Sequence, residues 1–558
     1  MKLPFLATAA LLAIAALLAT TVACSSNSAS SPTPTSEATA TIEATSTAPA
    51  SASTTDGITL RDPAERERVR AALAGLTAIE VSDEPLSGGT AYTVQTWAAV
   101  AGQRSDVLEL TLDELRRILR GEITDWSTLG GSPLPLTVEL PTADAGMIAS
   151  ALNVTLPPNV ARKPLAEVLA DAASKPGVLA LVPVSDLRLG ILALVIDGHD
   201  PYRDPAAQSP LRAERWLRAS DAATTTEAAR RLDWDAAPPN PAGLLATGDY
   251  IPARCAWSSA VADGGPLRIF DAPGMRDLLR AADLTVVPLE VGLMTSSDPT
   301  PCVATTVLQG PASAVDALAD AGVDVLTRAS NHALDCYGGC SGVLVKQETD
   351  SVLEAAGIPS VGVGNGSEET STALVIERDG VRFALLAYDD IAPWYHSTPG
   401  GVGTGGLDLN TLAADVRAAK ARADHVLVAI HAGIEYQAEP TEHQRDAART
   451  AIEAGATLVI GNHPHWVQAT ERLTSASGAE GFVVYALGNF VFDQPWSTET
   501  QQGMLLEAGF TRDRLIGVRL RPHMIRDRYR PTLLDPATEG ASILERVWVA
   551  TDGLLGNR

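Results

Sequence analysis

Five apolar, strand-like runs in the second half of this 558-residue chain each lead directly into polar side chains. Helical patterns lie between these runs, at 311–321, 342–356, 407–422 and 441–454. Strands that alternate with helices predict an α/β sheet, and such sheets carry their sites beyond the carboxyl ends of the strands. The pattern therefore predicts one shared site, formed by Asp249, Glu290, Asn331, His332, His431, His463 and His465.

The types of these side chains indicate a metal centre. Carboxylate, amide and imidazole groups are ligands for Mn, Fe or Zn, and no thiolate stands among them. His463 and His465 flank Pro464, so a rigid turn would direct both rings into one pocket. The chain has neither the G-x-S-x-G motif of a serine hydrolase nor the G-x-x-x-x-G-K-[ST] loop of a nucleotide-driven enzyme. We therefore expect metal-assisted hydrolysis or group transfer with one or two divalent ions.

The same motifs resemble those of the CapA-type poly-γ-glutamate capsule biosynthesis proteins, a branch of the calcineurin-like metallophosphoesterases. The resemblance runs from about 244 to 521 and includes Tyr-Ala-Leu-Gly-Asn-Phe-Val-Phe-Asp at 485–493. It implies a four-layer α-β-β-α sandwich with metal ions held between two sheets. It also implies a role in the biosynthesis of a poly-γ-glutamate capsule or a related cell-surface polymer.

The resemblance further implies which side chains bind metal. Asp249 and His465 would hold one ion, and Glu290 would occupy the place of the superfamily's bridging carboxylate. The superfamily pattern begins D-x-H, but here Ile251 supplies no ligand, so the first position is short of donors. The ligands implied for the second ion are Asn331, His431 and His463.

Four further residues complete the candidate site. The resemblance makes His332 the general acid that protonates the leaving group, beside the metal ions but not bound to them. Asp335 either orients that imidazole or begins a helix, and Glu435 and Tyr436 are candidates for substrate contact. The Gly/Pro-rich loop at 391–406 is either a rim over the pocket or a mobile surface loop. Two other histidines, His425 and His443, lie in polar helix-edge patterns that predict solvated side chains.

Four cysteines in the body of the chain favour an oxidising compartment, because an even number of cysteines allows full pairing. The preferred pairing is Cys255 with Cys302 and Cys336 with Cys340. A cysteine metal site is the alternative, but no C-x-x-C motif is present.

The start of the chain has the pattern of an export signal. A charged residue and an apolar run lead to small residues and then Cys24, which resembles a bacterial lipobox over 1–24. Thr21 stands where lipoboxes usually carry Leu, and an uncleaved membrane anchor is the alternative. The Ser/Thr/Ala/Pro-rich segment 25–57 predicts a disordered linker. We therefore expect an extracytoplasmic lipoprotein that is tethered to the membrane through Cys24.

A first α/β body is predicted over 58–235, before a proline-rich boundary near Pro238. A capped helix at 110–119, a turn-rich link at 121–131 and strand-like runs thereafter resemble the phosphate-type substrate-binding proteins. That family's phosphate loop is replaced here by 141–146, which adds the negative Asp144. This body is interpreted as a degenerate binding domain that serves as a scaffold, binds another small ligand or retains anion binding. The metal-binding domain would span 241–530, and 531–558 would be a C-terminal extension.

The charge of the chain limits its partners. A net charge of −25 repels phosphate backbones, so we expect no nucleic acid partner. The expected substrate is an anionic cell-surface polymer or a phosphoester, and envelope biosynthesis machinery is a further candidate partner. The alternative function is a non-catalytic envelope binding or scaffold protein with a vestigial metal site.

Overall fold

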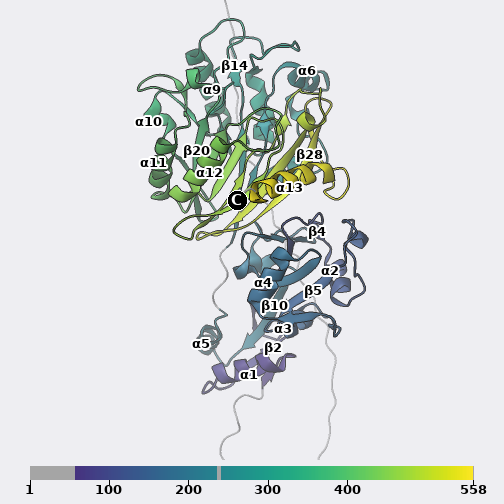
Figure 1. The fold of residues 1–558 in the computed structure, drawn as a ribbon. Helices are drawn as coiled ribbons and strands as arrows, with labels where there is room; N and C mark the ends of the chain where they lie inside the picture. Colours follow the sequence, from purple (N-terminus) through teal and green to yellow (C-terminus); the bar gives the residue numbers. More distant parts are fainter. Residues whose placement is uncertain (1–56, 235–239, 557–558) are drawn as a thin grey trace, which may run out of the picture. The chain divides into compact units, whose positions relative to one another are not determined.

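A computed structural model describes residues 57–234 and 240–556 (Figure 1). The expected signal segment, Cys24, nearly all of the expected linker and Pro238 lie outside the described residues. Within the described ranges, none of the helices has both the length and the apolar character needed to cross a membrane.

The first described range forms an eight-stranded mixed sheet with helices on both faces. Alternate residues of its central strand face opposite sides, so Trp97 packs with one set of helices and Val100 with the other. The strands, in sheet order, are β1 (Gly57–Thr59), β2 (Glu80–Ser82), β10 (Arg212–Arg218), β3 (Thr90–Gly102), β7 (Val178–Pro183), β5 (Thr137–Pro141) and β6 (Ala161–Lys163), with β8 (Ile191–Ala193) beside β3. The helices are α1 (Pro63–Ala72), α2 (Leu112–Leu119), α3 (Ala145–Ala151), α4 (Leu165–Ser174) and α5 (Ala222–Leu232).

Two local features of this range bear on the sequence predictions. The helix expected at 110–119 is confirmed as α2, and it begins at a capping box in which Thr111 and Glu114 bond each other's backbone. Asp144 precedes α3 without a side-chain bond to that helix, and burial raises its pKa. A carboxylate in this position opposes the binding of an anion.

The second described range contains two sheets that face each other. The first has seven strands in the order β17 (Ser360–Val361), β16 (Val325–Thr327), β13 (Leu284–Pro288), β11 (Ala242–Ala246), β27 (Gln502–Phe510), β28 (Leu515–Arg526) and β29 (Arg530–Leu533). The second has six strands in the order β19 (Leu374–Arg378), β20 (Val381–Asp389), β22 (His425–His431), β23 (Leu458–Asn462), β25 (Glu480–Val484) and β24 (Thr470–Thr474).

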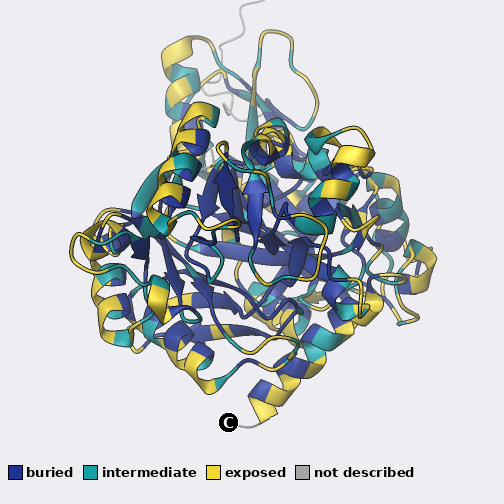
Figure 2. Ribbon diagram, turned by 90° about the horizontal axis from the view of Figure 1, so that it is seen from above, coloured by how far each residue is buried: buried dark blue, intermediate teal, exposed yellow. Residues whose placement is uncertain are grey.

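The buried side chains divide this range into four layers. Leu244 faces the other sheet and packs with Phe383 and Leu427, whereas its neighbour Leu245 faces the helices on the outer side. The helices on that side are α6 (Arg254–Ala262), α7 (Met275–Ala281), α8 (Val315–Asp320) and α9 (Gly342–Ala356). The second sheet is covered on its outer side by α11 (Leu409–Lys420) and α12 (Glu442–Ala454). Figure 2 shows the buried strands inside a shell of more exposed helices. The predicted α-β-β-α architecture is confirmed.

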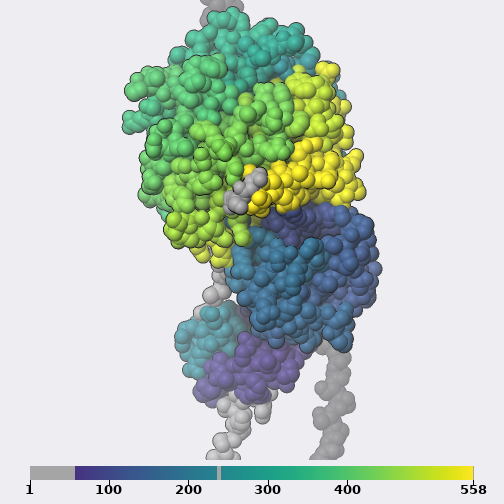
Figure 3. Space-filling model, viewed as in Figure 1, coloured from purple at the N-terminus to yellow at the C-terminus, as the bar shows by residue number. Residues whose placement is uncertain are grey.

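The C-terminal residues join the same architecture. α13 (Ala541–Gly556) contacts β24 and β27, and its Ile543 and Val547 are buried in the core between the sheets. The outer side of α13 lies on the surface, where it is drawn in yellow (Figure 3).

The parallel strands bring the polar segments together. β11, β13 and β16 are parallel to one another, as are β20, β22 and β23. The residues that follow or end these strands therefore collect at one edge of each sheet.

One histidine prediction is wrong. His425 opens β22 and is only 2% exposed, because the rings of Phe383 and Phe510 pack against it. Its Nε2 lies 2.7 Å from the carbonyl oxygen of Thr511, and burial lowers its pKa to about 4. His443, by contrast, is exposed and lies 3.3 Å from a carboxylate oxygen of Asp390.

Candidate metal centre

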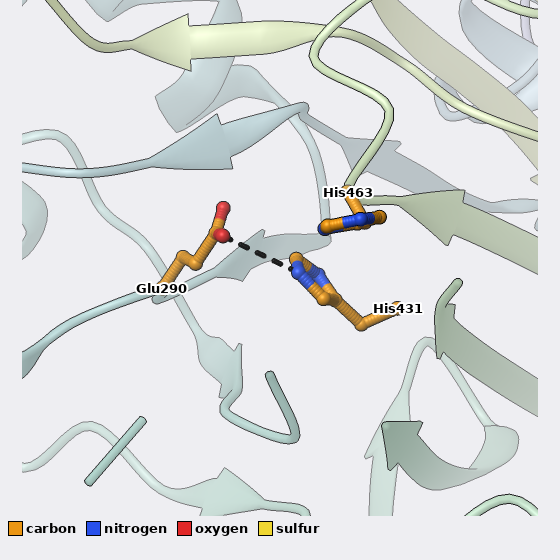
Figure 4. Close-up of side chains that lie close together, drawn as sticks. All are labelled: Glu290, His431 and His463. Carbon is orange, nitrogen blue, oxygen red and sulfur yellow. Dashed lines mark ion pairs between the residues drawn. The ribbon is translucent and has the colours of Figure 1, made fainter. Parts of the chain in front are cut away.

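Two groups of buried ligand atoms share one carboxylate. Glu290 lies with Asp249 and His465 in one group and with His431 and His463 in the other. Within each group the ligand atoms lie within 4.8 Å of one another. Figure 4 shows the second group, in which side chains from three separate chain segments point toward one another. The structure thus brings together five of the six residues that the sequence assigned to metal binding.

Several polar atoms in these groups are buried without a hydrogen-bond partner among the described residues. They are both carboxylate oxygens of Glu290, Oδ1 of Asp249 and Nδ1 of His463. A buried carboxylate without compensating bonds costs several kcal/mol, roughly, and a cation removes that cost. Oxygen and imidazole donors in this arrangement fit a divalent metal of the Mn, Fe or Zn type.

The second group is completed by the sixth predicted ligand, Asn331, which follows β16. The Nε2 atom of His431 lies 2.8 Å from Oδ1 of Asn331 and 3.3 Å from Oε1 of Glu290. His431 ends β22, so the side chains meet where the two sheets face each other.

Charges in the centre shift the pKa values in opposite directions. Burial alone would raise the pKa of Glu290, but the positive charge of His431 lowers it to about 2. Burial opposes a charge on His431, and the carboxylate of Glu290 nevertheless raises its pKa. The pKa of Asp249 is raised by burial and by the neighbouring negative charge of Glu290. The carboxylate of Glu290 and the ring of His431 therefore stabilise each other's charged forms.

The turn around Pro464 has an unusual backbone. His463 and His465 have φ angles of 97° and 58°, in the left-handed region that non-glycine residues rarely adopt. The backbone nitrogen of His463 donates to Oδ2 of Asp249 at 3.3 Å, which links the turn to the first group. Strained conformations of this kind occur at functional sites, where the surrounding structure holds them.

The two rings of this turn differ in charge. Burial and the charges of neighbouring histidines lower the pKa of His463 well below its ordinary value. Burial also opposes a charge on His465, but a hydrogen bond with Asp249 and the charge of Glu290 raise its pKa to about 9. A neutral His463 is the form that binds a metal.

His332 lies beside these groups, and its charge contributes to the pKa shifts of Glu290 and His463. Its Nδ1 lies 2.7 Å from Oδ2 of Asp335. Asp335 directly follows the turn at 331–334, and the next helix begins only at Gly342. Of the two alternatives for Asp335, the geometry favours the orientation of the imidazole.

The two candidate substrate-contact residues differ in exposure. The Tyr436 ring stacks near the ring of His465, with centroids 6.2 Å apart, and Tyr436 donates its backbone N–H to the carbonyl oxygen of Pro464. Burial and neighbouring Glu435 raise the pKa of Tyr436. Glu435 itself is exposed.

The four cysteines form two disulfides in the structure. Cys255 pairs with Cys302 and Cys336 pairs with Cys340. The second bond directly follows Asp335 in the chain. The first involves α6, where the backbone nitrogen of Cys255 donates to Oδ2 of Asp493 at 2.8 Å.

Two residues near the centre were missed by sequence reasoning. Asp389 is completely buried at the end of β20, directly beside His431 in the sheet register. The apolar run before it, 383–388, is the signal that would have found it. Asn489 lies 2.8 Å from Nδ1 of His465, and its place in the 485–493 motif gave no indication of this contact.

Known proteins resemble this chain over its second half. Residues 243–494 match the family described as "Bacterial capsule synthesis protein PGA_cap". The chain is 32% identical over 203 residues to "Capsule biosynthesis protein CapA" of Bacillus anthracis, covering 35% of this chain and 46% of that protein. It is 31% identical over 205 residues to "PGA biosynthesis protein CapA" of Bacillus subtilis (strain 168), covering 36% of this chain and 50% of that protein. The chain thus spans about half the length of the curated relatives it matches.

Solved structures that resemble parts of this chain include two kinds of protein. A 5'-nucleotidase precursor from Thermus thermophilus is 15% identical, with a TM-score of 0.32, and covers 57% of this chain and 59% of that one. An ABC-type phosphate transport receptor from Vibrio cholerae is 19% identical, with a TM-score of 0.25. The match covers 30% of this chain and 77% of that one. The predicted resemblance is confirmed by the sequence matches: residues 243–494 match the PGA_cap family of bacterial capsule synthesis proteins, and the second half of the chain is similar to the CapA proteins of two Bacillus species.

Proposed function

We propose that this chain is an exported, metal-dependent hydrolase or transferase that acts on a phosphoester in the biosynthesis of poly-γ-glutamate capsule or a related cell-surface polymer. The observation that carries the proposal is the shared carboxylate of Glu290, which is buried between two groups of ligands; the ring of His431 lies 3.3 Å from Oε1, and neither oxygen has a partner in hydrogen-bond geometry among the described residues. The ligands would be Asp249, Glu290 and His465 for one ion and Glu290, Asn331, His431 and His463 for the other.

A divalent metal bound there would polarise a phosphoryl oxygen and lower the pKa of a coordinated water. His332 supplies the complementary chemistry. Its Nδ1 proton is engaged by Asp335, so Nε2 is the atom that exchanges a proton with substrate. Positioned acids of this kind contribute about 10²- to 10⁴-fold in rate.

The proposed reaction balances without a further reactant. The P–O bond to the leaving alcohol breaks, and its electron pair goes to the alcohol oxygen, which takes a proton from Nε2 of His332. Water adds its oxygen to phosphorus and releases one proton, which restores His332. The products are an alcohol and a phosphate ester with one fewer organic group.

We favour a phosphoester over a γ-glutamyl amide because bound metal ions would neutralise the charge on the phosphoryl oxygens while His332 protonates the leaving alcohol. The chain's net charge of −25 disfavours an anionic polymer at long range. The polymer would therefore be held locally, by the positive charge of the metal at the centre and by contact with Tyr436 beside it, since the exposed Glu435 carboxylate repels an anion.

One observation favours a second candidate, a non-catalytic envelope binding or scaffold protein. Ile251 is completely buried where the superfamily pattern has a histidine ligand, so the first group has fewer donors than that pattern. In this case the metal would be structural. Both candidates include attachment to the membrane through Cys24, and the two disulfides support an oxidising, extracytoplasmic location.

The test combines metal content with turnover. The full-length protein would be purified in detergent and analysed by metal mass spectrometry, then assayed with a chromogenic bis-phosphodiester and with poly-γ-glutamate. We expect metal near one or two equivalents and hydrolysis of the diester. Bound metal without turnover of either substrate would favour the scaffold, and no metal uptake after Mn, Fe or Zn is supplied would overturn both the site and the enzyme.

A further inference from the structure

The carboxylate of Asp335 accepts hydrogen bonds from three parts of the chain. Its Oδ2 accepts from Nδ1 of His332 at 2.7 Å and from the backbone nitrogen of Leu308 at 2.8 Å. Its Oδ1 accepts from the hydroxyl of Tyr395 at 3.0 Å. Tyr395 belongs to a short 3-10 turn, Pro393–Tyr395, in the loop 391–406 that follows β20. A residue from the opposite sheet's loop thus holds the second oxygen of the carboxylate that bonds His332.

The hydroxyl of Tyr395 remains a donor at any physiological pH. Burial and the negative charge of Asp335 raise its pKa to about 12. The adjacent Trp394 is 73% exposed, so only one of the two neighbouring aromatic side chains faces inward.

The loop that carries Tyr395 is held at both ends. The backbone nitrogen of Ile391 donates to Oδ1 of buried Asp389 at 2.9 Å. Farther along, Ser397 donates its backbone N–H to the carbonyl oxygen of Thr404, and its hydroxyl lies 2.8 Å from that of Thr370. These bonds favour a fixed rim beside the site over a mobile surface loop.

The geometry points to Tyr395 as a positioning residue for the proton transfer by His332. Without Tyr395, Oδ1 of Asp335 would lose its protein donor, and the carboxylate could rotate about the bond that carries it. With Tyr395 in place, one oxygen remains directed at His332, and Nε2 of that ring keeps its direction toward the leaving group. This inference rests on the proposed phosphoesterase function and adds a residue outside the metal ligands.

Positioning of an acid has a signature that general loss of structure lacks. A nitrophenolate leaves without a proton, whereas an alkoxide requires one. A misplaced acid therefore slows the cleavage of alkyl esters and spares nitrophenyl esters, and displacements of about 1 Å cost up to roughly 10²-fold.

The test uses full-length Tyr395→Phe, which removes one hydroxyl. The substrates are two phosphodiesters that differ only in the leaving group, which is methyl in one and nitrophenyl in the other. We expect kcat for the methyl ester to fall about 10- to 100-fold and kcat for the nitrophenyl ester to fall less than about twofold. KM should be unchanged for both. Trp394→Ala, which alters the same turn without touching Asp335, should leave the ratio of the two rates as in the unmodified protein. Equal losses on both esters in Tyr395→Phe would overturn the inference and leave the phosphoesterase function standing.

A second measurement needs no turnover. Proton NMR of the full-length protein should show the Nδ1 proton of His332 protected by its bond to Asp335, with assignment by its loss in His332→Gln. We expect Tyr395→Phe to broaden this resonance by faster exchange and Trp394→Ala to preserve it. If the unmodified protein cleaves neither ester, the proposed function fails, and this resonance alone decides whether Tyr395 positions the pair. An unchanged resonance in Tyr395→Phe would overturn the inference.

Discussion

The side-chain oxygen of Asn489 lies 2.8 Å from Nδ1 of His465. The amide nitrogen of Asn489 donates to the carbonyl oxygen of Thr500 at 2.8 Å and to Oε1 of Gln494 at 3.2 Å, so the amide cannot reverse without losing both bonds. The oxygen of Asn489 therefore accepts the Nδ1 proton of His465. In the neutral ring, which is the form that a metal binds, the lone pair of Nε2 is then available for coordination.

Replacement of Asn489 by Ala should weaken metal retention by about 10- to 100-fold, because the tautomer and orientation of His465 lose their support. The measurement is competition with a graded chelator. Gln494→Ala is the matched control, since it removes a partner of Asn489 and leaves the contact with His465 in place. Equal affinity in Asn489→Ala and the unmodified protein would show that this contact does not serve metal binding.

The shared position of Glu290 predicts a difference in stoichiometry between two charge-neutralising variants. Glu290→Gln should reduce the metal content of both groups, whereas Asp249→Asn should affect only the group that includes His465. Metal mass spectrometry after gel filtration gives the ratio of metal to protein for each variant. A Glu290→Gln protein with undiminished metal would contradict the assignment of the shared carboxylate.

Substitution of His332 by Ala should lower kcat for an alkyl phosphodiester by about 10²- to 10⁴-fold and leave metal content unchanged, because His332 donates a proton and is not a ligand. His443→Ala is a suitable control, since that ring is exposed and pairs with Asp390. Loss of metal in His332→Ala would instead make His332 a ligand.

His523 predicts how stability depends on pH. It is completely buried, neither of its ring nitrogens has a hydrogen-bond partner among the described residues, and burial lowers its pKa to about 3. The unfolded chain, with a histidine pKa of about 6.5, binds the proton first, so stability falls as pH drops from about 6.5 toward about 3.

Between pH 7.5 and 5.0, the contribution of His523 to the free energy of unfolding should fall by about 2 kcal/mol. Urea unfolding at both pH values measures the change, with disulfides kept oxidised. In His523→Leu the pH-dependent loss should shrink by that amount, even if the variant is less stable at both pH values. An identical pH-dependent loss in both proteins would mean that His523 is protonated in the folded state.

The polar residues at the ends of strand-like apolar runs predicted much of the fold and of the metal centre from the sequence. Glu290 and His431 end apolar runs on different sheets, and parallel strands are sufficient to bring such residues to one edge. The local sequence pattern could not predict contacts between residues that are far apart in the chain. His425 follows polar residues and was expected in solvent, but Phe383 and Phe510, which are distant in sequence, bury it. The bond between Tyr395 and Asp335 likewise spans 60 positions and depends on how a loop folds.

The Cys255–Cys302 disulfide closes a ring of the chain with a sequence separation of 47, and Glu290 lies inside this ring while the histidines of the centre lie outside it. Closing a ring of that size removes conformational freedom worth about 4 kcal/mol from the unfolded chain in the entropic model. Protein produced in a reducing cytosol would begin folding without that advantage. This covalent ring therefore favours an order of assembly in which the Cys255–Cys302 disulfide forms before the metal binds. Recombinant production should use the same order.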